Sequence, residues 1–405
     1  MLSTERVSLT ALGMVCALGD RSRLIQEGLR QGNQSGIQPY LVQQGEASVL
    51  TGQVSTPLPT VPVELSHLDS RNTRLLLAAY LPIAGEVEAC IKTYGADRVG
   101  VVLGASAQGI DIAEQSYAHW LQHGELPTSY HYNQQELGSA AEVLARYAGA
   151  QGPAYCIGTS CSSSAKAIVA ARNLLTSNIC DAVIVGGVDG LCQLTVQGFS
   201  ALDAVSSSIS NPMSRNRDGI TLGEGAALFV MSREASFLSD TSSIYLLGAG
   251  ESGDAHHVSS PDPSGKGAIL AMQKALSNAG LAPSDIDYLN MHGTGTALND
   301  SMESLAIAEV LGTEVPCSST KPLTGHTLGA AGAIELGICW LTLSQKDDTA
   351  PWLPCHVWDG EPDEALPTLQ LVTPAFQPKS IPRRIMSNSF AFGGNNASLI
   401  VGVDE

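Results

Sequence analysis

The chain has 405 residues, of which 44% are hydrophobic, so it can bury a sizeable core and intrinsic disorder is excluded. Only 15% of the residues are charged, against roughly 25% in an average globular protein, and the 41 glycines are an excess that indicates close backbone packing. The net charge of −18 argues against nucleic acid or an anionic membrane as the main partner, because phosphate contacts require a basic surface.

The first apolar segment, residues 7–18, predicts a buried strand rather than a secretory signal, because Glu5 precedes Arg6 and polar residues interrupt the run. No stretch of 18 apolar residues predicts a transmembrane helix. The nine cysteines show neither a CxxC pair nor zinc-ligand spacing, and most fit small buried residues. We therefore expect a cytoplasmic protein without membrane insertion and without a metal site.

Short apolar runs then alternate with helical stretches, which is typical of an α/β fold. In the first half, strands are predicted at 98–103, 181–187 and 226–231, and a helix follows Cys161. After a polar join at 232–243, strands are predicted at 244–247, 285–291 and 397–403, and helices at 267–279, 301–311 and 328–343. Because both halves repeat the strand–helix–strand pattern, we predict two related halves, 1–242 and 243–405, folded as one unit.

The first candidate site is the segment 154–165, in which a strand runs into a tight turn and a helix begins at or just after Cys161. Free backbone N–H groups and the helix dipole would lower the pKa of this thiol and make it a nucleophile at neutral pH. The alternative is a buried cysteine beside a serine-rich helix cap. A hydrolase elbow is not indicated, since Gly-x-Ser-x-Gly is absent from the turn.

Three later segments are further candidates. His292 ends a predicted strand and begins the rigid polar loop 292–296, where a structural role and a catalytic role are equally consistent with the pattern. Lys321 and His326 precede an apolar helix, and burying them without partners would be unfavourable, which favours a functional role. The loop 388–396 fits a hinge, a gate or a simple turn.

Together these motifs resemble the β-ketoacyl-acyl-carrier-protein synthases. The matching segments are GTSCSSS around Cys161, HGTGT at 292–296, KPLTGHTLGAAG at 321–332 and NSFAFGGNN at 388–396, in the family's order and near its spacing. The resemblance covers essentially the whole chain. It implies the thiolase fold, with duplicated halves in a five-layered αβαβα sandwich, usually dimeric. It also implies an acyltransferase that extends a Cys-bound acyl chain by a decarboxylative Claisen condensation with malonyl-carrier protein.

The resemblance carries roles onto individual residues. Cys161 is the nucleophile, His292 and His326 donate hydrogen bonds to the enolate, and Lys321 organises the site with Glu335 as its partner. The remaining positions are the backbone N–H groups of Cys161 and Phe392 as oxyanion hole, Ala391 and Gly393 in the gate, Phe390 as a substrate contact, and Thr294 and Thr296 on the phosphopantetheine arm. The Cys-His-His set favours the elongating branch, because initiating synthases use Cys-His-Asn and thiolases use a second cysteine. No bound cofactor is expected, since phosphopantetheine arrives on the acyl carrier protein.

The chain departs from the family at two positions. Ala391 stands where the gate commonly has glycine, and since alanine tolerates positive φ poorly, the loop would open less freely. Ala107, in the loop 104–109, replaces a bulkier gatekeeper, so we hypothesise a pocket for rigid or polyunsaturated chains. The weak candidates for carrier docking are Arg71, Arg74, Arg215 and Arg217, each of which fits a solvated surface charge equally well.

These departures favour an aryl polyene or other type II polyketide pathway, as a homodimer or as a heterodimer with a chain-length-factor-like subunit. Fatty-acid elongation and a non-catalytic chain-length-factor-like role are the alternatives. The GxGxxG at 248–253 gives a dehydrogenase only weak support. A dinucleotide-binding motif requires a helix that begins at these glycines, and none is predicted there. A metal site at His119 and His123, or at 256–257, lacks further ligands. Asp218 and Glu224 are interpreted as structural residues.

Overall fold

The computed structural model of the chain describes residues 6–42, 48–234, 236–237, 244–346 and 350–403. The helices are α1 (Ser22–Gln31), α2 (Arg71–Tyr80), α3 (Ala84–Tyr94), α4 (Ile110–His123), α5 (Ser139–Ala148), α6 (Ser163–Thr176), α7 (Gln193–Ala201), α8 (Lys266–Ala279), α9 (Ala297–Leu311), α10 (Lys321–Thr324) and α11 (Ala331–Leu343). The strands are β1 (Val7–Val15), β2 (Ile37–Leu41), β3 (Ser48–Gly52), β4 (Val99–Gly104), β5 (Ala154–Ile157), β6 (Ala182–Asp189), β7 (Leu222–Gly223), β8 (Gly225–Ser232), β9 (Ile244–Gly253), β10 (Tyr288–Asn290), β11 (Cys317–Ser318), β12 (Arg384–Ala391) and β13 (Asn395–Val403).

The strand order repeats between the two halves of the chain. The first half runs β5-β4-β6-β8-β1 and the second β11-β10-β12-β13-β9, so corresponding strands hold corresponding places. In each half the second strand pairs in parallel with both neighbours, and the other pairs are antiparallel. The halves join where β1 pairs with β9 at Val7–Leu246 and Ser8–Tyr245. The division that we predict at 242/243 lies outside the described residues and stays a prediction.

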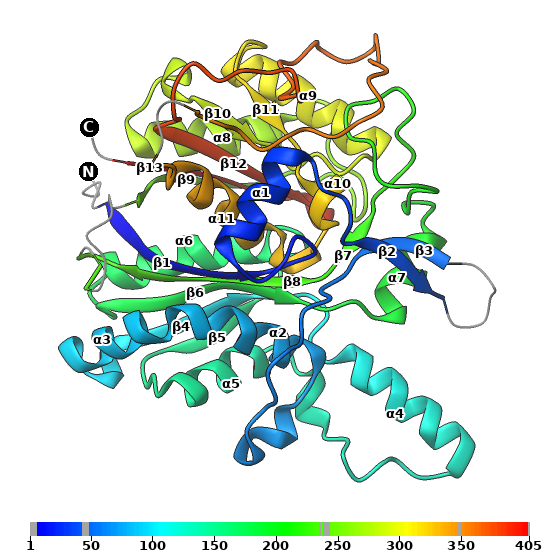
Figure 1. Ribbon diagram of the computed structural model, residues 1–405, viewed down its shortest axis with the longest axis vertical. Helices are drawn as coiled ribbons and strands as arrows, with labels where there is room; N and C mark the ends of the chain where they lie inside the picture. The colour runs from blue at the N-terminus through cyan, green and yellow to red at the C-terminus, as the bar shows by residue number, and fades with distance from the viewer. Residues whose placement is uncertain (1–5, 43–47, 235, 238–243, 347–349, 404–405) are drawn as a thin grey trace.

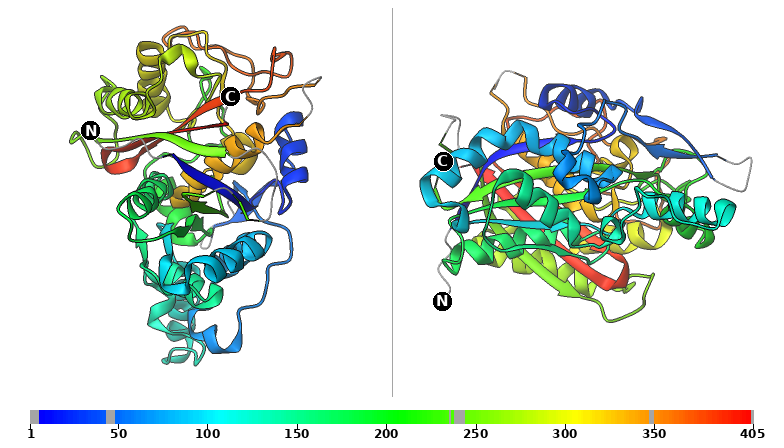
Figure 2. Two further views of the ribbon diagram at one scale, coloured as in Figure 1. Left: turned by 90° about the vertical axis from the view of Figure 1, so that its left-hand side faces the viewer. Right: turned by 90° about the horizontal axis from the view of Figure 1, so that it is seen from below.

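The layers are those of a five-layered αβαβα stack (Figure 1). Helices α2, α3 and α5 cover the outer face of the first half-sheet, and α8 covers the outer face of the second, with α9 packed on it. Helices α6 and α11 pack against each other between the two half-sheets. Figure 2 shows the same stack from two further sides. The α/β class and the layered duplication expected from the sequence are thus present.

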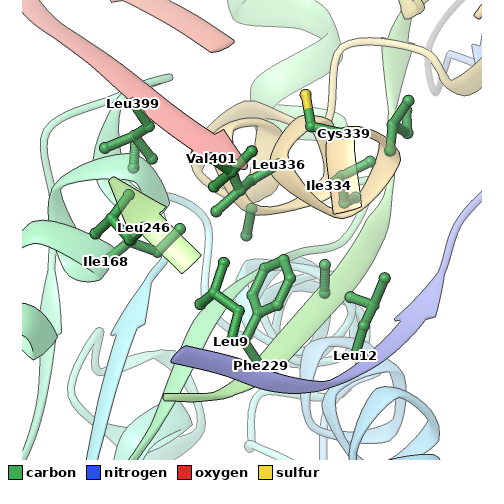
Figure 3. Packing of buried hydrophobic residues seen from close by; sticks show 14 of the residues in the cluster. Leu9, Leu12, Ile168, Phe229, Leu246, Ile334, Leu336, Cys339, Leu399 and Val401 are labelled. Carbon is green, nitrogen blue, oxygen red and sulfur yellow. The ribbon is translucent and has the colours of Figure 1, made fainter. Parts of the chain in front are cut away.

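Helix α11 forms the centre of the molecule, because twelve of its thirteen residues are buried. Ile334, Leu336 and Cys339 of this helix lie between residues of both half-sheets, including Phe229 and Val401 (Figure 3). The approach to α6 requires a glycine, since a Cβ on Gly332 would lie 2.8 Å from the backbone nitrogen of Ala165. Each fully buried leucine or phenylalanine contributes roughly 1.5–3 kcal/mol to folding.

Several elements differ from the sequence prediction. The strand expected at 244–247 continues to Gly253 as β9, and the helix expected at 301–311 begins at Ala297 as α9. The strand expected at 285–291 is confined to Tyr288–Asn290, because Pro283–Asp285 form a 3₁₀ turn. The helix expected at 328–343 begins as a 3₁₀ turn, Leu328–Ala330, before α11. Among the described residues no helix is long and apolar enough to cross a membrane.

The GxGxxG at 248–253 lies entirely within β9, paired with β13. Its first glycines allow α8 to approach the sheet closely: a Cβ on Gly248 would lie 2.3 Å from the carbonyl oxygen of Ala275, and one on Gly250 would lie 2.0 Å from that of Ala271. The motif therefore serves strand–helix packing, and no dinucleotide-binding turn forms there.

Candidate active site

Cys161 lies in the turn between β5 and α6, at the end of a cavity. The preceding residue, Ser160, adopts the left-handed conformation with φ +54°, which turns the chain sharply before the helix. Ser163 fixes this turn, because its Oγ accepts the Thr159 N–H at 2.8 Å and donates to the Ser160 carbonyl at 2.6 Å. The thiol is buried but reaches the cavity wall.

Two histidines from the second half meet this thiol. His326 lies in the segment between α10 and α11, and its Nε2 is 3.0 Å from Cys161 Sγ. His292 follows β10, and its ring centre is 5.3 Å from that of His326 in a T-shaped arrangement. Both histidines are almost fully buried and line the same cavity as Cys161.

Lys321 and Glu335 form a buried ion pair behind His292. The Lys321 ammonium donates to the Glu335 carboxylate and to the His292 carbonyl oxygen, and it lies 3.4 Å from His292 Nδ1. The side chains of Lys321 and Glu335 are only 1% and 3% exposed, so water does not screen the pair. The lysine that the resemblance implies and its carboxylate partner are brought together as expected.

The charge states of the site follow from burial. Desolvation, followed by the Lys321 charge, lowers the pKa of both His292 and His326 well below the usual value, so both imidazoles are neutral at pH 7. Burial raises the pKa of Glu335 to about 7, while Lys321 opposes that rise. Burial also raises the pKa of Cys161 to about 11, although Lys321 and the Phe392 N–H lower it.

The sequence prediction of a lowered thiol pKa is therefore wrong for the resting site. The helix N-terminus lies beside Cys161 as predicted, but removal of water from the thiolate outweighs it. Since the thiol is protonated and touches a neutral imidazole, it can become a nucleophile by passing its proton to His326.

Two buried carboxylates hold the loop 292–296, and neither was predicted from the sequence. Glu303 accepts the backbone N–H groups of His292 at 2.7 Å and Gly293 at 2.6 Å, and its burial raises its pKa to about 7. Asp300 accepts the Gly295 N–H at 3.2 Å. Acidic residues in the first turns of a helix that follows a glycine-rich loop were the signal that could have revealed them.

The two threonines lie on the cavity wall, at the start of α9. Thr294 Oγ1 and Thr296 Oγ1 are hydrogen-bonded to each other at 3.0 Å, and Thr296 caps α9 by accepting the Asn299 N–H. Both side chains line the cavity of about 320 Å³ that leads to Cys161. This position is compatible with the predicted contact to a phosphopantetheine arm.

The segment 390–394 closes one side of the site. Phe390 is buried at the end of β12, with its ring centre 6.4 Å from that of His292, and the Phe392 ring contacts Phe199 at 5.6 Å. Gly393 has φ +81°, while Ala391 has φ −106°. Because Ala391 is extended, alanine introduces no backbone strain in this conformation.

Ala107 does not line the cavity. It is buried, and its backbone N–H donates to Asp189 at 2.8 Å. Asp189 also accepts the Ser106 N–H and the Gly329 N–H, so it joins the loop 104–109 to the segment that follows His326. The predicted acyl-pocket role of Ala107 stays a prediction.

Comparison with known proteins places this site in a family. Residues 70–236 match the model of the β-ketoacyl synthase N-terminal domain, and residues 245–351 match that of the C-terminal domain. The chain belongs to the β-ketoacyl synthase family. The 3-oxoacyl-[acyl-carrier-protein] synthase 2 of Coxiella burnetii is 32% identical over 99% of both chains, and that of Synechocystis is 30% identical over 98% of both. This β-ketoacyl synthase is therefore of the acyltransferase type that the motifs predict.

Solved structures show the same fold. A ketosynthase (ApeO) from Xenorhabdus doucetiae, in complex with its chain length factor (ApeC), superposes with a TM-score of 0.92 at 42% identity, covering 99% of this chain and 98% of that one. The ishigamide ketosynthase/chain length factor superposes with a TM-score of 0.87 at 25% identity, covering 99% of this chain and all of that one. The predicted thiolase fold of the β-ketoacyl synthases is thus confirmed.

The predicted docking arginines all lie in ion pairs. Arg71 pairs with Glu224, which is 1% exposed and also accepts the Val54 N–H, and Arg217 is 7% exposed and pairs with Asp363. Arg217 is held at the cavity wall, so it is a poor docking charge, whereas the Arg71 side chain is 36% exposed and stays a candidate. Glu224 has the predicted structural role. Asp218 has it too, since it accepts the Ser206 and Ser207 hydroxyls. The exposed pairs are Arg74–Asp69 and Arg215–Glu361.

The alternative sites receive little support. His119 and His123 lie side by side on α4, with ring centres 4.3 Å apart, and no acidic or thiol group completes a ligand set there in the described chain. Within the described residues, the group with metal-ligand spacing is Cys161, His292 and His326, whose donor atoms lie within 4.8 Å of one another. These are the side chains of the synthase site itself, and the expected absence of a metal stays a prediction.

Proposed function

We propose that this β-ketoacyl synthase extends an acyl chain held on Cys161 by two carbons, through decarboxylative condensation with malonyl-carrier protein. The observation that carries the proposal is the 3.0 Å contact between the Cys161 thiol and His326 Nε2. This pair lies in a buried site that also holds His292 and Lys321. A thiol beside a neutral imidazole is a nucleophile with its base already in place.

Acylation is the first step. Cys161 attacks the thioester carbonyl of an acyl chain delivered on the carrier's phosphopantetheine arm. Because burial keeps the thiol protonated, His326 Nε2 takes the proton as the carbon–sulfur bond forms. The N–H groups of Cys161 and Phe392, which face the sulfur, stabilise the oxyanion. The carrier's thiol leaves with the proton from His326, and acyl-Cys161 remains.

Condensation is the second step. In malonyl-carrier protein the bond to the carboxyl carbon breaks, CO₂ leaves, and the electron pair forms an enolate at the thioester. His292 Nδ1 faces the Lys321 ammonium, which can only donate, so Nε2 carries the proton and donates to the enolate oxygen. His326 Nδ1 has no hydrogen-bond partner among the described residues, so the ring proton can move from Nδ1 to Nε2, and His326 is then the second donor. The enolate carbon attacks acyl-Cys161, the carbon–sulfur bond breaks, and the released thiolate takes one proton from water.

The test follows acylation and condensation separately. Cys161→Ala should abolish the mass increase of the enzyme on incubation with acyl-carrier protein and should abolish formation of the 3-oxoacyl product. Cys156→Ala, which changes another free thiol five residues earlier, should leave both intact. Acylation or product formation that survives in Cys161→Ala would overturn the proposal.

The proposal includes two partners. Acyl carrier protein supplies both substrates, and a second thiolase-fold subunit covers the apolar surface at α4 and the β5 edge. Tyr117 and Leu121 on α4 are 58% and 63% exposed, and β5 ends the sheet of the described strands. The two ketosynthase neighbours above were solved with chain length factors, which favours a heterodimer over a homodimer. Co-expression with each candidate subunit, followed by size-exclusion chromatography, distinguishes the two.

We further propose a cytoplasmic aryl polyene or other type II polyketide pathway. The 42% identity with a ketosynthase that has a chain length factor exceeds the 32% identity with the synthase 2 of Coxiella burnetii, which supports this choice over fatty-acid elongation. Supplied with the matching ketoreductase and dehydratase, the enzyme should form conjugated polyenyl-carrier products, visible by absorbance. Products that stay saturated when an enoyl reductase is added, and condensation that halts without one, would favour fatty-acid elongation.

A further inference from the structure

His356 is a buried histidine that the mechanism above does not use. In the chain it lies in the segment that connects α11 to β12. Its side chain is 0% exposed and does not line the cavity that leads to Cys161. Its Nδ1 accepts the Ser319 N–H at 3.1 Å, and its Nε2 lies 3.1 Å from the Pro212 carbonyl oxygen. Since an amide N–H only donates and a carbonyl only accepts, the proton is fixed on Nε2. Both ring nitrogens are therefore satisfied in a single tautomer.

Ser319, the first partner of His356, is hydrogen-bonded to the backbone beside the catalytic residues. Ser319 donates its hydroxyl to the Gly293 carbonyl at 2.6 Å and accepts the Lys321 N–H at 3.3 Å. Ser319 thus joins the loop that carries His292 to the start of α10, where Lys321 stands. A shift of Ser319 would change the position of the Lys321 ammonium relative to His292.

Pro212, the second partner of His356, is connected through hydrogen bonds of its neighbour to the other end of the same loop. Pro212 precedes Met213, whose N–H donates to Asp300 at 2.9 Å, and Asp300 accepts the Gly295 N–H. The His356 imidazole therefore contacts both segments that hold the loop 292–296, one through Ser319 and the other through Pro212.

We propose that His356 is a positioning residue for the malonyl step, which holds His292 and Lys321 in place through Ser319 and Pro212. The proposal rests on the proposed function. Burial lowers the pKa of His356 to about 4, so its Nδ1 stays available as an acceptor at pH 7. The backbone around it is anchored separately, because the His356 N–H donates to the Val372 carbonyl and the Cys355 N–H to the Leu29 carbonyl. Changing the side chain should therefore leave this segment in place.

The test compares two replacements of similar size. His356→Phe fills the space but leaves the Ser319 N–H and the Pro212 carbonyl unpaired, whereas His356→Gln offers one acceptor and one donor. Because His356→Phe leaves the Ser319 N–H without its acceptor and frees Ser319 to shift, it should lower kcat for malonyl-carrier decarboxylation roughly tenfold or more. KM for malonyl-carrier protein and the rate of Cys161 acylation should change by less than about threefold, and His356→Gln should recover most of kcat.

Several results would overturn the positioning role. They are an unchanged kcat in His356→Phe, an equal loss of acylation and decarboxylation, and a Gln variant no better than the Phe variant. If His356→Phe does not fold, His356→Asn and His356→Ala take its place in the same comparison, with folding checked by thermal unfolding. A wild-type enzyme that fails to decarboxylate malonyl-carrier protein would overturn the proposed function, whereas active wild-type enzyme with insensitive variants would overturn the role of His356 alone.

Discussion

The loops after β4 and β10 occupy the same place in the two duplicated halves, yet they carry different chemistry. The loop after β4, residues 104–109, has small side chains apart from Gln108 and is held by the carboxylate of Asp189. The loop after β10, residues 292–296, carries His292 and is held by the carboxylate of Glu303. In each case a buried acid accepts two consecutive backbone N–H groups. Asp189 ends β6 whereas Glu303 lies in α9, so the two halves fix their loops by the same kind of contact from elements that do not correspond.

The largest effect on activity is expected at Lys321, the buried cation of the second half. Lys321→Met should lower decarboxylation by roughly a hundredfold or more, because it removes the group that fixes the proton on His292 Nε2. It should also lower the free energy of unfolding by about 3–5 kcal/mol, since Glu335 is left buried without its partner. Urea unfolding and steady-state kinetics check both. Adding Glu335→Gln should recover stability without recovering activity; recovery of activity would contradict the role of Lys321.

A matched pair of amide substitutions compares the two loops directly. Glu303→Gln places an NH₂ group against a backbone N–H and should lower malonyl decarboxylation by roughly ten- to a hundredfold. Asp189→Asn makes the same change in the first half, where it should alter the preference among acyl chains and lower decarboxylation less than Glu303→Gln does, since Asp189 contacts the His326 segment only through the Gly329 N–H. Single-turnover acylation and malonyl decarboxylation measure the two steps. If both variants lose the same step to the same extent, the division of labour between the loops is wrong.

The pH dependence of stability provides a third comparison. The pKa of Glu303 is raised from its usual 4.5 to about 7, so the folded state binds more protons than the unfolded state between these values. Its contribution to stability is present below about pH 4.5 and is lost as the pH rises through 7. The free energy of unfolding of the wild type, relative to Glu303→Gln, should therefore fall from pH 5 to pH 8 in urea titrations. A constant difference across this range would show that Glu303 is already ionised.

A smaller effect is expected at Ala107 in the loop 104–109. Ala107→Phe restores a bulky side chain and should reduce acylation by rigid polyunsaturated carriers severalfold more than acylation by saturated carriers of equal length. Competition between the two carriers, followed by mass spectrometry of Cys161, measures the ratio. A wild-type enzyme that strictly prefers saturated chains would contradict the pocket hypothesis.

The smallest effect is expected from charge reversal on the surface. Arg74→Glu and Arg215→Glu should raise KM for the carrier by a few-fold, because carriers are acidic and the enzyme already has a net charge of −18. Arg23→Glu is the matched control, since Arg23 is also exposed and paired with a carboxylate. An equal change in all three variants would indicate a general field effect and no docking site.

Sequence patterns predicted the features that are local in the chain. The nucleophile turn, the two histidine segments and most strands could be found because each is encoded within about ten residues. Some of the features that they missed join distant segments. Arg71 forms an ion pair with Glu224, and His356 accepts a hydrogen bond from the Ser319 N–H. No local sequence pattern indicates either contact. The pKa of Cys161 was mispredicted for the same reason, because burial depends on how the whole chain folds.

The segment that closes the site is made long after the thiol that it covers. Cys161 belongs to the first half, while Phe392, whose N–H faces the sulfur, lies near the end of the chain. At roughly 5–20 residues per second, a ribosome needs some ten to fifty seconds to pass from one to the other. During that interval the nucleophile first lacks its base, His326, and then still lacks the Phe392 N–H of the oxyanion hole. Acylation of Cys161 can therefore report that synthesis of a new chain has passed β12 and Phe392.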